Sequence, residues 1–280
     1  MTAAVIDPRV ARPARARRSG HLSLASGLGL GVAMLWFSVL VLLPLAAVVI
    51  TASEGGWSAF WQTITNEQTA AAIRLTVGTA ALVTLVNVVM GTLIAWVLVR
   101  DEFVGKRFFE VLIDIPFALP TIVAGLVLLS LYGPESPLGI DVAHTRSAVF
   151  LAFLFVTLPF VVRTVQPVLA ELDFEVEEAA ASLGASRFTT FRRITLPSLI
   201  PAIAAGAALS FARGVSEYGS LVLLSGNLPF QTEVTSVRIL SSIENDNLAG
   251  AASVATALLA ISLAVIVLLD VLQRRIVRRG

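Results

Sequence analysis

The amino-acid sequence is dominated by long apolar runs, and this feature most limits what the chain can fold into. Six runs are long enough to cross a bilayer as helices, which takes about 20 apolar residues. They are residues 28–51, 75–99, 111–132, 147–168, 199–224 and 250–272. Only 14% of the 280 residues are charged, against about 25% in a typical soluble domain. We therefore predict an all-α integral membrane protein with six transmembrane helices.

The first apolar run follows a basic tail, residues 1–27, whose arginines are Arg9, Arg12, Arg15, Arg17 and Arg18. A signal peptide also begins with a basic segment, but its apolar part has only about 7–15 residues. The first run is longer than that, and we interpret it as an uncleaved span. Residues 28–280 are therefore predicted to form one transmembrane domain, with no second domain.

Arginine and lysine are distributed unevenly among the segments between the runs. Short cytoplasmic segments of membrane proteins carry an excess of these residues. If the N-terminus is cytoplasmic, 16 of the 20 basic residues fall in cytoplasmic segments. The distribution predicts a multi-pass protein of the cell membrane with both termini in the cytoplasm. It also places residues 170–197, between the fourth and fifth runs, on the cytoplasmic side.

The residue inventory disfavours several kinds of chemistry. The chain has no cysteine, and its two histidines, His21 and His144, lie outside the apolar runs. An intramembrane hydrolase would therefore have neither cysteine nor histidine at membrane depth. An ion-coupled secondary transporter typically depends on embedded acidic or histidine relays, and here Glu217 is nearly alone. The sequence also contains no GxxxxGK[ST] motif, so we expect this chain to bind no nucleotide, metal or other cofactor itself.

Residues 170–197 form a polar stretch between two apolar runs. The sequence predicts a helix that ends at Gly184, a residue suited to a left-handed turn. A second short helix is predicted from Ser186, its N-cap, to Ile194. Pro197 is expected to open the next span, since proline is tolerated in a first helical turn. The alternative is a solvated loop with incidental apolar residues.

The spacing within this stretch favours a more specific interpretation. Glu178-Ala179-Ala180, Gly184, Ile194 and Leu196-Pro197 resemble the signature loop of permease subunits of ABC importers. In that family the loop forms a coupling helix that docks into a groove on a separate ATPase subunit. The resemblance implies the type I ABC importer permease fold. The signature residues that it assigns to ATPase coupling are Glu178, Ala179, Ala180, Gly184, Ile194, Leu196 and Pro197. Leu183, Phe188 and Phe191 would form an apolar edge that no lipid covers, and we assign them to the same contact.

Four further segments, residues 114–129, 158–173, 208–220 and 226–236, are similar to the sulfate/thiosulfate permeases of the CysT type. This resemblance implies a non-catalytic subunit of an ATP-driven importer that moves sulfate, and thiosulfate, by alternating access. The implied partners are a second homologous permease subunit, an ATPase dimer that binds ATP and Mg, and an extracytoplasmic sulfate-binding protein. The alternative is a permease for molybdate or another tetrahedral oxyanion.

The third run contains candidates for a substrate path. Pro116 and Pro120 are expected to kink or break this span and so free backbone groups that must face protein or water. Broken helices can direct their positive ends toward anions, and Thr121 adds a hydroxyl group. Plain helix packing explains the same prolines.

The remaining candidates are charged. Arg213 and Glu217 are four residues apart and are expected on one helical face, either as a structural pair or as part of the anion path. Arg163, followed by Gln166, either lines the inner mouth or anchors the span at the cytoplasmic interface. Arg74 either receives the anion or marks the outer interface. Residues 226–236 are the better candidate for contacting the binding protein.

Overall fold

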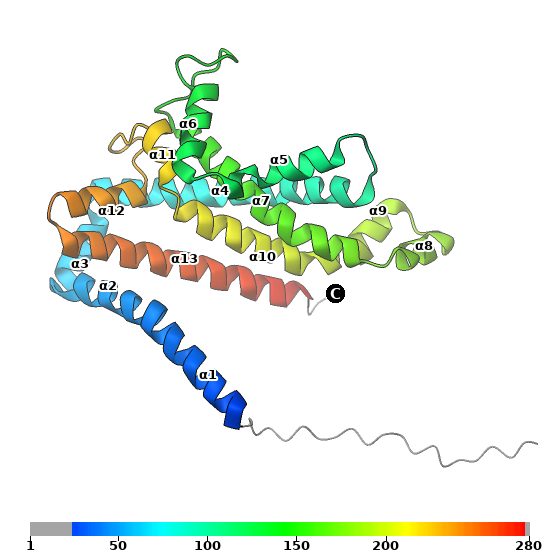
Figure 1. Cartoon of the computed structure of the whole chain (residues 1–280), viewed down its shortest axis with the longest axis horizontal. Helices are drawn as coiled ribbons and strands as arrows, with labels where there is room; N and C mark the ends of the chain where they lie inside the picture. Colours follow the sequence, from blue (N-terminus) through cyan, green and yellow to red (C-terminus); the bar gives the residue numbers. More distant parts are fainter. Residues whose placement is uncertain (1–23, 278–280) are drawn as a thin grey trace, which may run out of the picture. The chain divides into compact units, whose positions relative to one another are not determined.

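The computed structural model describes residues 24–277, and all regular structure in that range is helical (Figure 1). The predicted basic tail lies, for all but its last four residues, outside the described residues. The chain divides into two units, residues 1–47 and 48–280.

The described part of the first unit consists of α1 (Leu24–Phe37), a π-helical turn η1 (Ser38–Leu42) and the start of α2 (Leu43–Ser53). The helical stretch Ser26–Ser53 is apolar throughout, and none of its most apolar window is buried. It agrees with the first predicted span. Within the stretch, Ala52 of α2 is buried, and an apolar helix of this length is typical of a membrane span.

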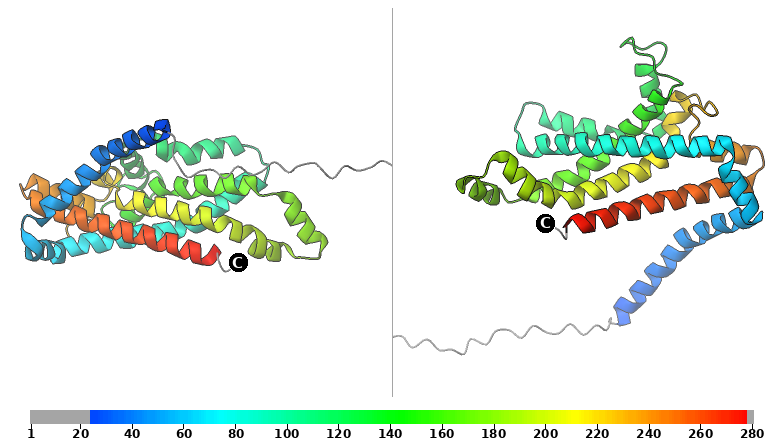
Figure 2. Two further views of the ribbon diagram at one scale, coloured as in Figure 1. Left: turned by 90° about the horizontal axis from the view of Figure 1, so that it is seen from below. Right: turned by 180° about the vertical axis from the view of Figure 1, so that it is seen from behind.

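The second unit holds the remaining helices. They are α3 (Gly56–Thr65), α4 (Glu67–Arg100), α5 (Lys106–Ala118), α6 (Thr121–Tyr132), α7 (Arg146–Glu171), α8 (Phe174–Ser182), α9 (Arg187–Thr190), η2 (Phe191–Thr195), α10 (Leu196–Val215), α11 (Gly219–Leu224), α12 (Thr235–Glu244) and α13 (Leu248–Val277). The long helices α4, α7, α10 and α13 run side by side along the bundle (Figures 1 and 2). In the described part of the chain, five stretches are long and apolar enough to cross a membrane, and the bent pair α5–α6 makes a sixth if its halves count as one span.

A polar junction lies where α4, α7 and α10 meet. The side-chain amide of Asn87 on α4 donates hydrogen bonds to Thr157 Oγ1 on α7, at 2.7 Å, and to Ser210 Oγ on α10, at 3.2 Å. All three side chains are buried. Lipid offers these groups no alternative partner, so such bonds fix which helix faces meet. Apolar side chains fill the core on both sides of the junction.

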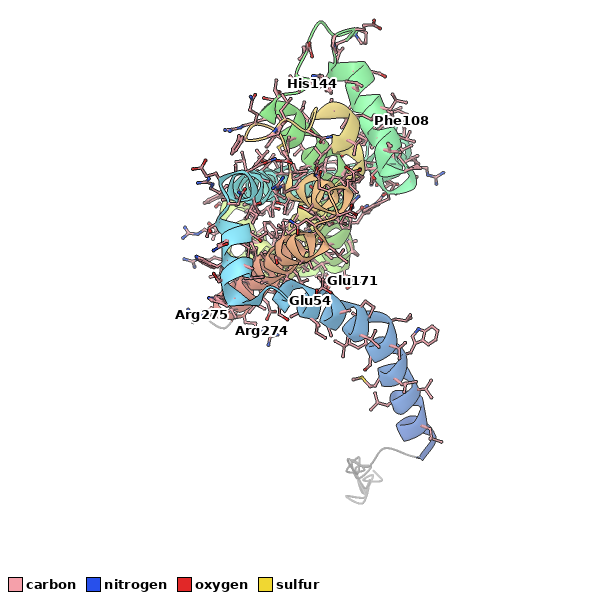
Figure 3. The ribbon with its side chains drawn as sticks, turned by 90° about the vertical axis from the view of Figure 1, so that its left-hand side faces the viewer. Glu54, Phe108, His144, Glu171, Arg274 and Arg275 are labelled. Carbon is pink, nitrogen blue, oxygen red and sulfur yellow. The ribbon has the colours of Figure 1, made fainter. Side chains whose placement is uncertain are left out.

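The third span is broken, as predicted, and the break lies at Pro120, whereas Pro116 lies inside α5. The axes of α5 and α6 differ by 117°, and Pro120 is the N-cap of α6. Pro120 has no N–H to continue the ladder, and it pushes the preceding residue Leu119 into an extended conformation. The α6 helix consequently projects from the bundle (Figure 1). Seen along the bundle, His144 lies on the side where α6 projects, and Arg274 and Arg275 lie on the opposite side (Figure 3).

The prediction of one continuous fifth span over residues 199–224 is wrong. The α10 helix ends at Val215, and a separate six-residue helix, α11, begins at Gly219. The α11 helix packs closely on α6: a Cβ atom built on Gly125 would lie 2.6 Å from the carbonyl oxygen of Ser220. The break falls at residues 216–218, Ser-Glu-Tyr, a polar interruption that the prediction treated as part of one apolar run.

This close packing predicts the effect of a single methyl group. Gly125→Ala places a Cβ against the backbone of α11, and such overpacking costs about 1–3 kcal/mol. We expect a lower melting temperature for the purified variant. The control is Gly78→Ala on α4, where a Cβ meets nothing within 4 Å and helix propensity favours alanine. Equal melting temperatures of the two variants would contradict the packing of α6 on α11.

Candidate functional site

The segment of residues 170–197 contains two helical pieces joined by a tight turn, as predicted. Asp173 caps α8 by accepting a hydrogen bond from the N–H of Glu175 at 2.9 Å. The turn is made at Gly184, whose φ of +85° lies in the left-handed region that favours glycine. Ser186 caps the next helix by accepting from the N–H of Thr189 at 3.2 Å. Local sequence chemistry therefore specifies this turn.

The second helical piece differs from its prediction. It was expected to end at Ile194, with Pro197 opening a new helix. Instead α9, η2 and α10 follow one another without a break, and Arg187–Val215 is one continuous helical stretch of 29 residues, long and apolar enough to cross a membrane. We attribute the continuity to the wider π turn η2, which ends just before Pro197 and relieves the clash of its ring with the preceding turn. The fifth span therefore begins at Arg187, with α9, inside the 170–197 segment.

The apolar side chains of the segment have different surroundings. Leu183 and Phe188 are 89% and 70% exposed, so they offer an apolar surface. Phe191, expected on the same edge, instead packs edge-on against Trp96 of α4 with ring centroids 5.4 Å apart. The other residues assigned to coupling are either exposed, namely Glu178, Ala179, Gly184 and Pro197, or half-buried, namely Ala180, Ile194 and Leu196.

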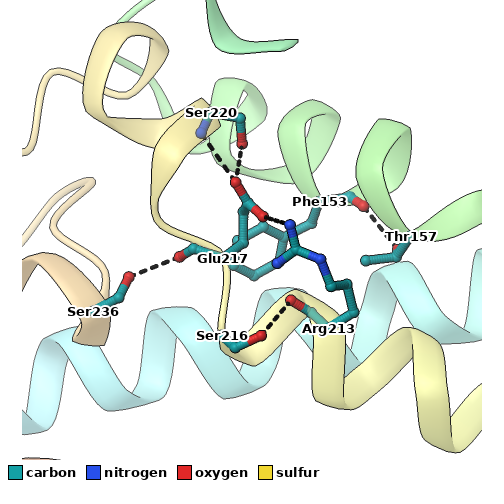
Figure 4. Close-up of polar contacts among 7 residues, drawn as sticks. All are labelled: Phe153, Thr157, Arg213, Ser216, Glu217, Ser220 and Ser236. Carbon is teal, nitrogen blue, oxygen red and sulfur yellow. Dashed lines mark hydrogen bonds and ion pairs between the residues drawn. The ribbon is translucent and has the colours of Figure 1, made fainter. Parts of the chain in front are cut away.

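Glu217 occupies the break between α10 and α11 (Figure 4). Its side chain is fully buried and forms a 2.6 Å ion pair with Arg213. Its other carboxylate oxygen accepts hydrogen bonds from the N–H and the hydroxyl group of Ser220, at 3.0 and 2.9 Å. Ser236, at the start of α12, donates to the backbone carbonyl of Glu217 at 2.7 Å. Glu217 therefore neutralises the charge of Arg213 and accepts a hydrogen bond from a backbone N–H at the start of α11. Its backbone carbonyl also links the break to α12.

Sequence spacing placed Arg213 and Glu217 on one face of a helix, and this part of the prediction is wrong. Glu217 lies beyond Ser216, the C-cap of α10. The two side chains still meet, because the Glu217 N–H bonds to the carbonyl of Gly214 at 3.1 Å and so continues the last turn of α10 by one residue. Arg213 remains 28% exposed while Glu217 is not exposed at all.

Arg163 has a partner that sequence reasoning missed. Its guanidinium binds both carboxylate oxygens of Asp114 on α5, at 2.7 and 2.5 Å, and also donates to Gln166. A planar guanidinium suits this two-point contact. The side chains of Arg163 and Asp114 are 32% and 47% exposed, and charges at membrane depth normally face protein or a water-filled cavity. An acidic residue inside an apolar run, two positions before Pro116, was the available signal.

Two further candidates, Thr121 and Arg74, have other neighbours. Thr121 is the first residue of α6 and packs against Gly219 at the start of α11. Arg74 lines a groove of about 1080 Å³ together with Arg146 of α7, which sequence reasoning did not select as a site residue. Arg146 donates to the backbone carbonyls of Phe230 and Gln231, so it fixes the loop before α12.

Solved structures of ABC transporters share this helical arrangement. The chain superposes with a TM-score of 0.73 on a chain of a bacterial ABC transporter that imports the acidic polysaccharide alginate, covering 89% of this chain and 94% of that one at 17% identity. It also matches a chain of the MetNI methionine ABC transporter with a TM-score of 0.52, covering 77% of this chain and 99% of that one at 18% identity. The fold is therefore that of a type I ABC importer permease, a class of multi-pass membrane protein.

Sequence comparison then gives the family. Residues 87–279 match the binding-protein-dependent transport system inner membrane component family, and the chain belongs to it. The chain is 42% identical to the sulfate transport system permease protein CysT of Salmonella typhimurium, over 90% of this chain and 94% of that protein. It is 43% identical to the protein of the same name from Synechocystis, over 87% of each chain.

The buried ion pair at the α10–α11 break predicts non-additive substitutions. Glu217→Gln leaves Arg213 without its counter-charge, and removing one partner of a buried pair costs about 3–5 kcal/mol. Because Arg213 is partly exposed, we expect a value at or below the lower end of that range. Arg213→Gln/Glu217→Gln should be more stable than Glu217→Gln alone, as measured by thermal unfolding of the purified variants. Strictly additive effects would contradict a direct pair.

Proposed function

We propose that the chain is one permease subunit of an ATP-driven importer of sulfate. The observation that carries the proposal is its 42% identity, over 90% of the chain, to a protein named as a sulfate transport system permease. Thiosulfate is proposed as a second substrate. Molybdate or another tetrahedral oxyanion is the alternative, but the named relatives do not favour it.

The proposed importer needs three kinds of partner besides this chain. A second homologous permease subunit would complete the passage, and an ATPase dimer would bind ATP and Mg. An extracytoplasmic binding protein would deliver the anion. One support for this last partner is the alginate transporter, whose structure is of a complex with a periplasmic protein bound to alginate pentasaccharide. In this arrangement both termini and the 170–197 segment are cytoplasmic.

The 170–197 segment is proposed to dock on the ATPase. Its exposed Leu183 and Phe188 would provide the apolar anchors, and the turn at Gly184 would bring them together. Because α9 continues through η2 into α10, a displacement of the docked segment would pass directly into the fifth span. ATP binding would thereby change which side of the membrane the passage faces.

The passage is proposed to run past the broken helices. Pro116, Pro120 and Thr121 would place the start of α6 along it. The two arginines are already compensated, Arg163 by Asp114 and Arg213 by Glu217. A compensated arginine attracts an anion less strongly than a free one, which suits a protein that must release its substrate on the other side.

The loop before α12 is proposed to contact the binding protein. Asn227 and Phe230 in this loop have positive φ angles, and Phe230 is 54% exposed. Strained, exposed loop residues are often found at binding sites. Its anchoring by Arg146 would hold the loop in shape for that contact.

The docking proposal predicts that bulk at the glycine turn releases the ATPase. We expect Gly184→Arg to lower co-purification of the ATPase tenfold or more, which corresponds to about 1.4 kcal/mol of docking free energy. Gly139→Arg is the matched control: Gly139 also has a positive φ, +69°, and a Cβ there also meets nothing. Equal co-purification with both variants would contradict docking through this segment.

The substrate proposal predicts the outcome of an uptake assay in cells that lack this gene. Radiolabelled sulfate uptake should return with the restored gene, because the anion then has its passage. Unlabelled sulfate and thiosulfate should compete, and molybdate should compete poorly. Uptake of molybdate, but not of sulfate, that depends on the gene would move the substrate to molybdate.

A further inference from the structure

A buried ion pair joins the 170–197 segment to the end of α4. Arg100, the last residue of α4, contacts Glu177 of α8 at 2.7 Å, and their side chains are 8% and 24% exposed. Thr195 of η2 donates a hydrogen bond to the same carboxylate oxygen at 3.1 Å. One carboxylate thus holds the first helix of the segment, its second helix and α4 together.

Aromatic side chains extend this contact. The guanidinium of Arg100 lies over the ring of Trp96, 5.4 Å from its centroid, which is within the range of a cation–π interaction. Trp96 in turn packs against Phe191 of η2. We name these five residues, Trp96, Arg100, Glu177, Phe191 and Thr195, the latch.

The opposite end of α4 contacts the loop before α12 and the start of α12. Gln68 donates a hydrogen bond to the carboxylate of Glu233 at 2.7 Å, and Glu233 is 5% exposed. The N–H of Thr235 donates to the hydroxyl group of Thr76 at 2.9 Å, and both residues are buried. The same helix that carries the latch therefore also holds the loop proposed to meet the binding protein.

The α4 helix is suited to connect these two ends. It has 34 residues, which corresponds to about 51 Å at the rise of an α-helix. It contains no proline, whereas α5, α7 and α10 each contain at least one. Proline is the commonest cause of a sharp kink, so α4 has less reason to bend than its neighbours.

We propose that the latch makes α4 a mechanical link between the 170–197 segment and the loop before α12. Arg100 and Glu177 are positioning residues: they hold the segment on α4, so that a displacement at the ATPase reaches the opposite end of the bundle. This inference rests on the proposed function, since it assumes that the ATPase docks on the segment.

The alternative is that the latch only stabilises the fold. A structural pair would affect the amount of assembled complex, whereas a link in the coupling would change how much sulfate moves for each ATP hydrolysed. The ratio of sulfate transported to ATP hydrolysed, measured on assembled complex, separates the two.

The test uses the whole complex, purified through this chain and reconstituted in lipid vesicles with ATP and sulfate-loaded binding protein. The variants are Glu177→Gln and Arg100→Gln. The matched control is Glu102→Gln, which makes the same chemical change in an ion pair with Lys106 whose carboxylate side chain is 89% exposed. Exposed pairs contribute little, so we expect the control to stay within about twofold of the unaltered complex.

We expect Glu177→Gln and Arg100→Gln to retain the ATPase but to lower the sulfate-to-ATP ratio by about fivefold or more, the usual lower bound for coupling between sites. Arg100→Glu/Glu177→Arg should recover part of the ratio. At the other end, Gln68→Glu sets a like charge against Glu233 and should weaken stimulation of the ATPase by loaded binding protein.

Three results would overturn the inference. The first is an unchanged sulfate-to-ATP ratio in Glu177→Gln and Arg100→Gln. The second is a loss of sulfate transport that is fully explained by a smaller amount of assembled complex. The third is unchanged stimulation of the ATPase by loaded binding protein in Gln68→Glu. Failure of the proposed function looks different, because the unaltered complex itself would then not transport sulfate on ATP hydrolysis.

Discussion

The structure depends on one constraint: lipid provides no hydrogen bonds and little solvation for charge, so polar groups at membrane depth must find partners within protein. Asn87 illustrates it by joining three helices through Thr157 and Ser210. Glu217 illustrates it at the broken fifth span, where its carboxylate pairs with Arg213 and accepts a hydrogen bond from the buried N–H of Ser220 in the first turn of α11. At these two places the polar groups that interrupt the apolar helices are paired within the protein.

The same constraint shapes how an anion would cross. A free arginine inside the membrane would be expensive and would hold an anion tightly, whereas the arginines here are paired. Arg163 binds Asp114 and Arg213 binds Glu217, and both arginines stay partly exposed. Positive charge is therefore present along the helices but is weakened by a neighbouring carboxylate. We propose that this arrangement lets an anion pass and be released, because a paired arginine binds an anion less tightly than a free one.

Local sequence predicted the parts of the fold that depend on local chemistry. Run lengths gave the positions of the spans except for the end of the fifth, Pro120 gave the break in the third, and Gly184 gave the turn. The parts that depend on distant partners were missed: Asp114 meets Arg163 49 residues away, and Glu177 meets Arg100 77 residues away. The break after Val215 was missed too, and Glu217 at this break is held both by the nearby Ser220 and by Ser236 of α12, 19 residues away. The roles of these residues in coupling and in the anion path remain predictions.

The central claim is that this chain forms a passage for sulfate that a partner ATPase drives. The most direct measurement is sulfate accumulation in vesicles containing the purified complex, with proton and sodium gradients abolished. We predict accumulation against the sulfate gradient that requires ATP hydrolysis and the binding protein. Accumulation that follows an imposed ion gradient and proceeds without ATP would contradict the account.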